Sequence, residues 1–319
     1  MKATIITPNY NGEKILDEYL QSLQEEKQYI NEVIIIDNNS QDQSKEIIKK
    51  YKKTLNITLI ENKTNLGFAK ACNQGIKHSN NEYILLLNND IKIQKNTIKK
   101  LLETIQEDPK IFSVMSKMIQ YHQPQLIDDA GDEYTILTYT QKKGNNQNIN
   151  KYNKKREIFS SCAGAALYKK SILNEIGLFD ENFFAYVEDL DLSYRAQIQG
   201  YKNIYQPESI VYHHGSATTG SKYNEFKTQI AARNNIYLIY KNYPTPQKII
   251  NFIFILIGLL IKYLVFYKKG YHKAYTKGIK EGIKNRKQLQ KTKYENKNLK
   301  NYFKIEWKLI INTIKLIKK

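Results

Sequence analysis

Short apolar runs alternate with helix-like patterns through the first hundred residues, and this alternation restricts the fold more than any other feature. The apolar runs lie at residues 3–7, 33–36, 57–60 and 83–87. The segments between them include helical patterns at 15–23 and 68–78 and a lysine-rich helix that reaches about residue 53. Such alternation with short links predicts an α/β fold, with a mostly parallel sheet flanked by helices.

Polar, turn-forming residues follow the end of each expected strand. They are Thr7-Pro8-Asn9-Tyr10, Asp37-Asn38-Asn39, the link 61–66 and Asn88-Asn89-Asp90. In open parallel sheets, ligands bind outside the carboxyl ends of the strands. One polar strand end says little, because most strand ends are polar. Four ends rich in Asn and Asp favour a nucleotide-type pocket.

The second half of the sequence is less regular. Residues 141–156 are rich in Lys, Asn and Gln and almost free of apolar side chains, which predicts a mobile loop. An apolar strand at 159–168, a helix near 171–176 and a helix ending at Gly200 are expected after it. Two further strands are expected at 204–205 and 210–212, the second running into His213-His214-Gly215.

Several chemical classes are disfavoured by what the sequence lacks. It has no Gly-x-Gly-x-x-Gly after the first strand, no phosphate-loop motif and no Gly-x-Ser-x-Gly elbow. Two cysteines, Cys72 and Cys162, exclude a disulfide scaffold and a cysteine-built metal centre, and they fit a reducing compartment. The first ten residues contain no charged-then-apolar leader, so no secretory signal is expected.

Carboxylates and one histidine pair remain as candidate reactive groups. Asp90 could hold a divalent cation against a diphosphate, or could simply begin the helix that follows. The carboxylates of the acidic segment 188–191 repel one another, and a cation, a proton or Arg195 could offset that repulsion. The segment could instead be a solvated helix N-terminus. His213 and His214 could supply one metal ligand or could serve packing alone.

Six motifs occur in an order that resembles a known family. They are Pro8-Asn9-Tyr10-Asn11, Asp37-Asn38-Asn39-Ser40, Asn65-Leu66-Gly67-Phe68-Ala69 with Ala71-Cys72-Asn73, Asn88-Asn89-Asp90, Glu188-Asp189-Leu190-Asp191-Leu192 with Arg195, and Tyr212-His213-His214-Gly215. Over roughly residues 2–240, this ordered set resembles the family 2 glycosyltransferases of the GT-A fold, in particular their rhamnosyltransferase-like branch.

The resemblance implies donor-binding residues. Thr7, Pro8, Asn9, Tyr10 and Asn39 would line the nucleoside, and Asp37 would hydrogen-bond its base. Asn65 and Gly67 would shape the wall beside the diphosphate. Asn88-Asn89-Asp90 stands where the family has its Asp-x-Asp motif, so Asp90 would bind Mg²⁺ or Mn²⁺. Asn88 replaces the first Asp of that motif, a departure that bears on metal affinity more than on the fold.

The resemblance also implies the reaction. Asp189 would be the general base, with Glu188, Asp191 and Arg195 supporting the acceptor side, and His213 would be a second metal ligand with His214 as its rival. The expected enzyme is an inverting glycosyltransferase that moves a sugar, rhamnose among the candidates, from a nucleotide-diphosphate donor to a lipid-linked or glycan acceptor of the cell surface. Residues 120–165 and 183–186 are expected to select the acceptor. The alternative is a non-catalytic sugar-nucleotide-binding scaffold.

The last eighty residues carry almost all of the net charge. Of the +19 total, residues 241–319 contribute +17, with 20 Lys and Arg against 3 Glu. Residues 249–267 are apolar except for Asn251 and Lys262, and as a helix they would be about 28 Å long, which is borderline for a bilayer. Apolar residues recur at helical spacing from Phe303 to Ile317, with lysines beside them.

These features predict a catalytic domain at 1–240 and a basic, membrane-associating helical tail at 241–319. An anionic membrane surface is the expected partner, and the expected location is the cytoplasmic face of the plasma membrane, held peripherally or by a single helix. Nucleic acid is a less favoured partner, because a nucleic-acid-binding tail does not need a long apolar run. A basic nucleic-acid-binding module is the remaining alternative.

Overall fold

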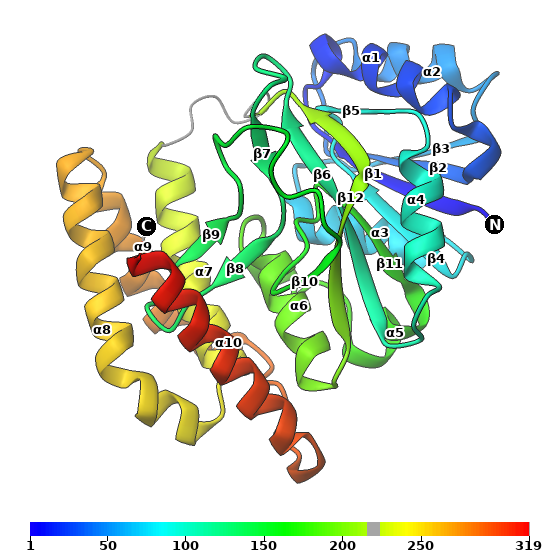
Figure 1. The fold of residues 1–319 in the computed structure, drawn as a ribbon. Coiled ribbons are helices and arrows are strands. Elements are labelled where there is room, and N and C mark those ends of the chain that lie inside the picture. Colours follow the sequence, from blue (N-terminus) through cyan, green and yellow to red (C-terminus); the bar gives the residue numbers. More distant parts are fainter. Residues whose placement is uncertain (216–223, 319) are drawn as a thin grey trace.

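The computed structural model describes residues 1–215 and 224–318, which form a central sheet with helices on both faces and a cluster of C-terminal helices at one side (Figure 1). The elements as far as α4 are β1 (Ala3–Asn9), α1 (Glu13–Gln24), β2 (Ile30–Asp37), α2 (Ser44–Tyr51), β3 (Ile57–Glu61), α3 (Phe68–His78), β4 (Tyr83–Leu87), β5 (Ile91–Ile93) and α4 (Thr97–Ile105). Those that follow are β6 (Ile111–Gln120), β7 (Ile127–Asp129), β8 (Asp132–Tyr134), β9 (Thr140–Lys142), β10 (Arg156–Ile158), β11 (Ala165–Lys169), α5 (Lys170–Ile176), α6 (Glu188–Ile198), β12 (Lys202–His213), α7 (Glu225–Asn242), α8 (Thr245–Lys268), α9 (His272–Asn285) and α10 (Leu299–Ile317).

The first four predicted strands form the parallel half of the sheet. Their order is β4-β1-β2-β3, and every neighbouring pair in this half is parallel. The run Val33–Ile36 is fully buried, as expected of a strand with helices on both faces. Because parallel neighbours end at the same edge, the register sets Asn9 beside Asp37. The α/β prediction is confirmed here.

The second half of the sheet continues past β4 in the order β11-β6-β12-β10, and it makes the sheet mixed rather than mostly parallel. Strand β11 is antiparallel to both β4 and β6, whereas β12 is parallel to β6. The two short strands expected at 204–212 are one strand, β12, whose register on β6 shifts between Gln206 and Ile210. Its last residue, His213, pairs with Ile91, and this register brings the histidine beside Asp90.

The segment 141–156, predicted as a mobile loop, is built into the fold by hydrogen bonds. Beyond the short ends of β9 and β10 it consists of turns. Lys117 donates from Nζ to the carbonyl of Ile149 and to the side chain of Asn153, 2.8 Å away. Polar contacts therefore attach a segment that has too few apolar residues to be held by packing.

The C-terminal helices pack on the sheet domain. Helix α10 contacts α6 and β8, and Asn312 donates to the carbonyl of Tyr134 at 3.0 Å. Buried Tyr134, Tyr194 and Leu309 belong to one apolar cluster. Helix α8 runs along the outer edge, on the side opposite α1 and α2 (Figure 1). By length and composition alone, α8 could cross a membrane. The expected domain boundary at residue 240 falls in the last turn of α7.

Candidate active site

Side-chain hydrogen bonds join the ends of β1, β2 and β4. Asn9 donates from Nδ2 to Asp37 Oδ1 at 2.9 Å, and Asn89 donates from Nδ2 to Asn9 Oδ1 at 2.7 Å. Gly12 packs against this pair, and a Cβ there would lie 2.4 Å from both the Asn9 oxygen and the Asn89 nitrogen. The predicted convergence of polar strand ends is therefore present for these three strands.

Two of the expected nucleoside residues are committed to internal contacts. Asp37 is fully buried and accepts hydrogen bonds from Asn9 and from the backbone and hydroxyl of Ser40, at 2.9 and 2.6 Å. The fully buried Thr7 hydroxyl bonds the Tyr19 hydroxyl beneath the sheet edge. These two side chains shape the strand ends from within, whereas Tyr10 is exposed.

The start of α3 touches a loop more than a hundred residues away in the sequence. Asn65 accepts the backbone N–H of Gly67 at 2.9 Å, and Gly67 has a φ of +83°. A Cβ on Gly67 would lie 2.5 Å from the ring of Phe184, and Ala69 donates its backbone N–H to the Phe184 carbonyl at 3.1 Å. Only glycine fits this close approach, which places the expected diphosphate wall against the loop 183–187.

A chain of buried groups links Asp90, His213 and Asp128. The Nε2 atom of His213 lies 3.3 Å from Asp90 Oδ2, and its Nδ1 atom lies 2.9 Å from Asp128 Oδ2. Burial opposes charge on the imidazole, but the two carboxylates outweigh it and raise the pKa of His213 to about 9. Asp90 Oδ1 is buried and has no hydrogen-bond partner. Asp128 was not among the residues that the sequence predicted.

Asp90 and His213 fit a divalent cation that is shared with a diphosphate. Within residues 1–215 and 224–318, no cluster of three or more His, Cys, Asp and Glu is arranged to hold a metal by itself. Mg²⁺, however, is commonly bound by one or two carboxylates together with substrate phosphates. The unpartnered Asp90 oxygen is a hard ligand of that kind. His214 bonds Glu18 at 3.0 Å instead and stacks on Tyr121, so His213 is the histidine that reaches Asp90.

Asp189 lies in the first turn of α6. Its Oδ1 accepts the N–H of Leu190 at 2.8 Å, and its Oδ2 accepts the N–H of Ala163 at 3.3 Å. Burial raises the pKa of Asp189, although these amides act in the opposite direction. Asn88 donates its backbone N–H to Gly164 at 3.0 Å. The segment 162–164 therefore lies between Asp189 and the end of β4, and it brings the acidic cluster to the same sheet edge.

The neighbouring Glu188 differs from Asp189 in its surroundings. Its Oε2 atom is buried and has no hydrogen-bond partner. Burial, and then the charge of Asp189, raise the pKa of Glu188 well above its ordinary value. Burial and the charge of Asp189 therefore both favour the protonated form of Glu188.

The loop before Asp189 is held in an unfavourable backbone conformation. Phe184, Tyr186 and Val187 have φ values of 64°, 67° and 72°, which side-chain-bearing residues rarely adopt. Such conformations persist only where the surroundings impose them. Asn234 of α7 does so: its Nδ2 donates to the carbonyls of Phe183, Ala185 and Tyr186 at 2.9, 2.9 and 2.7 Å. No signal in the sequence points to Asn234.

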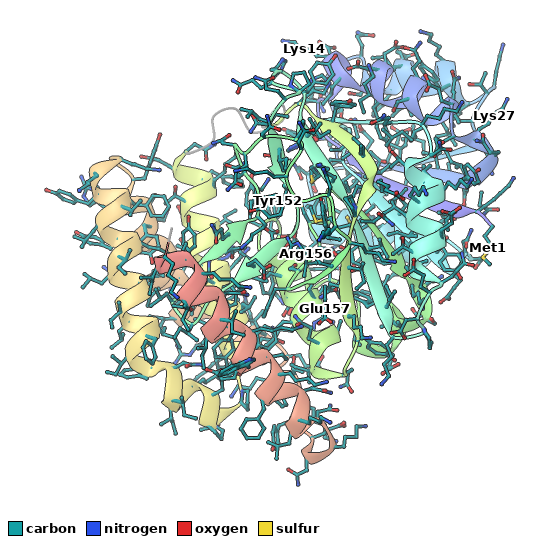
Figure 2. All side chains as sticks on the ribbon, viewed as in Figure 1. Met1, Lys14, Lys27, Tyr152, Arg156 and Glu157 are labelled. Atoms are coloured by element: carbon teal, nitrogen blue, oxygen red, sulfur yellow. The ribbon has the colours of Figure 1, made fainter. Side chains whose placement is uncertain are left out.

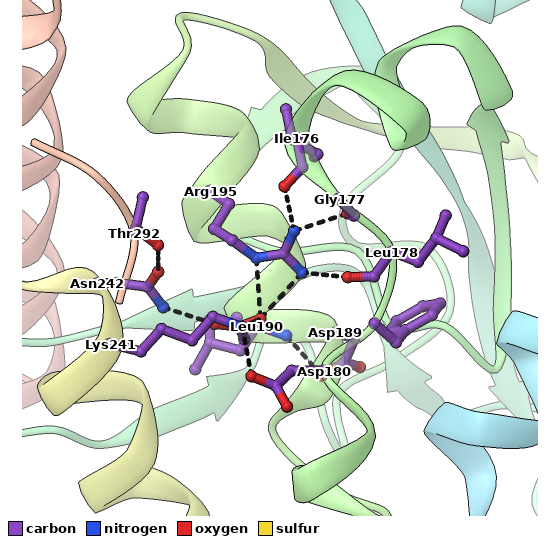
Figure 3. A network of polar contacts seen from close by, with 12 residues as sticks. Ile176, Gly177, Leu178, Asp180, Asp189, Leu190, Arg195, Lys241, Asn242 and Thr292 are labelled. Carbon is purple, nitrogen blue, oxygen red and sulfur yellow. Dashed lines mark hydrogen bonds and ion pairs between the residues drawn. The ribbon is translucent and has the colours of Figure 1, made fainter. Parts of the chain in front are cut away.

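Asp191 and Arg195 form a buried network that fixes α6 (Figure 3). Asp191 accepts from Arg195 Nε at 3.0 Å, from Lys241 Nζ at 3.1 Å and from Asn242 Nδ2 at 2.7 Å. Arg195 also donates to the carbonyls of residues 176, 177 and 178 at 2.6–2.7 Å. The network ties α6 to α5 and α7, so these two residues support the site by positioning the helix that carries Asp189.

Replacing Asp191 with Ala should destabilise the fold by about 3–5 kcal/mol, because it leaves buried Arg195 without its carboxylate partner and buried Lys241 with Asp180 alone. Burial disfavours the Asp191 charge, but Arg195 and Lys241 outweigh it and lower its pKa. The stabilisation is thus complete above the ordinary Asp pKa of about 4 and disappears as pH falls through the lower folded-state value. Urea unfolding measures both effects. Glu46→Ala, which removes an exposed ion pair with Lys49, should cost less than about 1 kcal/mol; equal losses would contradict the prediction.

More buried carboxylates extend the site into the segment expected to choose the acceptor. Lys142 lies 3.1 Å from Asp128 and 3.9 Å from Asp129. Burial, with a contribution from Asp128, raises the pKa of Asp129 to about 7 despite Lys142. Burial, and then the charges of Asp129 and Asp189, raise the pKa of Asp132. These carboxylates all lie in the segment 120–165, which is expected to select the acceptor.

The sequence matches the profile described as glycosyl transferase family 2 over residues 4–177, more than half of the chain. Among curated relatives, the chain is similar to a poly-beta-1,6-N-acetyl-D-glucosamine synthase of Staphylococcus aureus (strain COL). The two are 25% identical over 205 residues, 64% of this chain and 48% of the relative. The chain therefore spans about half the length of the curated relatives it matches.

Solved structures share the fold. GalNAc-T7 with UDP, GalNAc and Mn²⁺ superposes with a TM-score of 0.62 at 16% identity, over 75% of this chain and 47% of its own. S. aureus TarS 1–349 with UDP-GlcNAc superposes with a TM-score of 0.52 at 20% identity, over 92% of this chain and 94% of its own. At these identities the likeness shows the fold alone.

Proposed function

The chain belongs to glycosyl transferase family 2, and on that premise we propose that it is an inverting glycosyltransferase with a nucleotide-diphosphate sugar as donor. The observation that carries the proposal is the meeting of two sites at one sheet edge. Asp90 and His213 form one, the half-buried Asp189 forms the other, and the segment 162–164 lies between Asp189 and the end of β4.

The proposed reaction uses the two sites on opposite sides of the sugar. Asp189 takes the proton of an acceptor hydroxyl, and that oxygen bonds to the anomeric carbon. The bond from this carbon to the diphosphate breaks, its electron pair leaves with the diphosphate, and the anomeric configuration inverts. A divalent cation bound by Asp90 and His213 would offset the charge of the leaving diphosphate.

The surroundings of Asp189 suit a general base. Its raised pKa makes it a stronger proton acceptor than a solvated aspartate while leaving it available near neutral pH. The amides of Ala163 and Leu190 fix the direction of the carboxylate. The Glu188 Oε2 atom has no hydrogen-bond partner, and burial raises the pKa of Glu188 well above its ordinary value, so we assign the base to Asp189.

The donor can be identified by thermal stabilisation, because a ligand that binds the folded state raises the apparent melting temperature. We propose a panel that contains UDP-N-acetylglucosamine, which is bound in the TarS structure, and dTDP-rhamnose, which the branch resemblance implies. Each is tested with Mn²⁺. One of these or a related nucleotide sugar should raise the melting temperature by several degrees. No response to any member of the panel would contradict the proposal.

A non-catalytic sugar-nucleotide-binding role is the second candidate, favoured by Asn88 in place of an acidic metal ligand. In that case a nucleotide sugar would stabilise the protein, but no sugar would be released. Release of nucleoside diphosphate from the stabilising donor, measured over hours with and without acceptor, separates the two roles. We favour the enzyme because Asp90 and Asp189 are both present at the site, Asp90 buried and Asp189 half-buried.

For the acceptor and location we propose a lipid-linked or glycan acceptor of cell-surface polysaccharide synthesis, reached at the cytoplasmic face of the plasma membrane. The S. aureus relative is, by its name, a synthase of a glycan, poly-beta-1,6-N-acetyl-D-glucosamine. The exposed apolar side chains of α8 and the net charge of +17 on residues 241–319 support an anionic membrane as partner. Mg²⁺ or Mn²⁺ is the proposed cofactor.

The hydrogen bonds from Asn234 to the loop 183–187 lead to a separate prediction. Asn234→Ala should lower kcat about tenfold or more while donor affinity stays within twofold, because the carbonyls of Ala185 and Tyr186 lose this donor, that of Phe183 is left with Arg233 and the Ala185 amide, and the loop before Asp189 relaxes. Steady-state kinetics and donor titration measure the two effects. Asn235→Ala is the matched control, since Asn235 bonds its own helix and Tyr134 instead. Equal kcat in the two variants would refute the role.

A further inference from the structure

Helix α8 carries its polar residues on one face only. Gln247 and Asn251 both donate to Glu306 of α10, at 2.7 and 2.9 Å. Two turns and three turns beyond Asn251, Gly258 and Lys262 meet the loop between β8 and β9. Lys262 donates to the carbonyl of Thr138 at 2.6 Å, and a Cβ on Gly258 would lie 2.0 Å from the carbonyl oxygen of Leu137. This face contacts the rest of the protein from residue 247 to residue 262.

Apart from its contacts with α9, much of the rest of α8 is apolar and uncovered. Twelve apolar side chains between Ile249 and Tyr267 are each at least 42% exposed. The helix lies at the outer edge of the molecule (Figure 2). An exposed apolar surface of this extent marks a contact with a membrane or another protein.

The contacts of α8 conflict with an orientation in which this helix crosses the bilayer. Its 24 residues would measure about 36 Å, enough for the hydrocarbon core of about 30 Å. In that orientation, however, Glu306 and the loop at 137–138 would enter the hydrocarbon together with the helix. Lipid-exposed loops do not occur there, because their backbone groups would lack partners. The contacts fit a helix that lies along the membrane surface.

Helix α9, next to α8, carries positive charge that suits an anionic membrane. Helix α9 packs beside α8, with the Tyr275 hydroxyl donating to the Leu259 carbonyl at 3.3 Å. Lys273, Lys277, Lys280 and Lys284 are exposed on α9 at helical spacing and line one surface. Lysines beside an apolar face are typical of helices that bind anionic lipid at the interface.

We infer that α8 lies in the plane of an anionic membrane, with its uncovered apolar face in one leaflet, and does not span it. The inference rests on the membrane location proposed above and not on sugar transfer. It orients the enzyme: the sheet domain stays on one side of the bilayer, attached along the length of α8.

Vesicle binding of the full chain, without donor, tests the surface. The protein should float with vesicles that contain phosphatidylglycerol and bind weakly to pure phosphatidylcholine. Leu260→Asp should weaken binding about tenfold or more, because it puts a charge in the apolar face. The control Lys27→Asp changes the charge more, but at the opposite edge of the molecule (Figure 2), and should leave binding within about twofold. A soluble chain that does not float, or a dimer whose dissociation requires the same Leu260→Asp change, would overturn the inference.

Chemical labelling of the two ends of α8 distinguishes a helix that lies along the membrane from one that spans it. Thr245→Cys and Lys268→Cys are made singly in a chain with Cys72→Ala and Cys162→Ala, and a membrane-impermeant maleimide is added outside sealed vesicles. An in-plane helix exposes both ends to the reagent. Labelling of only one end would show a spanning helix and overturn the inference while leaving the membrane location intact. If the cysteine-free chain melts early, the Leu260→Asp comparison in the native chain still decides between membrane and no membrane.

Discussion

Replacing Asp189 with Asn should lower the transfer rate about 10²–10⁴-fold and leave donor affinity nearly unchanged. Asn keeps the size of the side chain but cannot take the acceptor proton, and general base catalysis is worth about that factor. The carboxylate contacts only the amides of Ala163 and Leu190 among the described residues, so the fold should tolerate the change. Single-turnover transfer and donor titration measure the two quantities.

Glu188→Gln is the matched control for this variant. The two carboxyl groups are neighbours in the sequence, and burial raises the pKa of both. Because burial and the charge of Asp189 favour the protonated form of Glu188, Gln resembles that form, and transfer should fall less than about tenfold. If Glu188→Gln stops transfer while Asp189→Asn does not, the two assignments must be exchanged.

The pH profile gives an independent check. A base works in its deprotonated form, and the pKa of Asp189 is raised by burial, so the transfer rate should rise with pH through a midpoint above the ordinary Asp value of about 4. Asp189→Asn should remove this limb from its residual activity. A wild-type profile that is flat from pH 4 to pH 7 would contradict a buried base at this position.

The part of the site that could be predicted from the sequence is the part fixed by strand order. Successive parallel strands end at the same sheet edge, so Asn9, Asp37 and Asn89 could be expected to meet, and they do. The unbroken run at 33–36 likewise specifies a strand buried on both faces. Periodicity also located α8 and α10, because a long apolar run and an amphipathic stripe are local patterns.

The remaining contacts depend on elements that no local pattern connects. His213 meets Asp128 across 85 positions because β7 pairs with β6 beside β12, a pairing that strand periodicity does not specify. In the sequence, Asn234 resembles any polar residue of a helix. Its role depends on its contacts with the loop 183–187, which only the structure shows. Asp37 was expected to present its oxygens to a nucleobase, but Ser40 and Asn9 engage them.

Removal of divalent metal should stop transfer, and the residues around Asp90 should set how much metal is needed. Treatment with EDTA should abolish activity, and excess Mn²⁺ or Mg²⁺ should restore it. Asp90→Asn should raise the half-saturating Mn²⁺ concentration by well over tenfold, because it removes the only unpartnered carboxylate oxygen at the end of β4. Mn²⁺ binding in the presence of nucleoside diphosphate, followed by electron paramagnetic resonance, reports affinity without turnover.

Asp128 and His214 make this prediction specific. Asp128 holds the far nitrogen of His213 at 2.9 Å, and such partners of a metal-binding histidine are typically worth 10–100-fold in metal affinity. Asp128→Asn should therefore give an intermediate Mn²⁺ requirement, whereas His214→Gln should leave it unchanged, since the His214 ring is engaged by Glu18 and Tyr121. Undiminished activity in EDTA would remove the cation from the reaction. If His214→Gln, and not Asp128→Asn, weakened Mn²⁺ binding, the metal ligand would be His214. The contacts of His213 with Asp90 and Asp128 would then be structural.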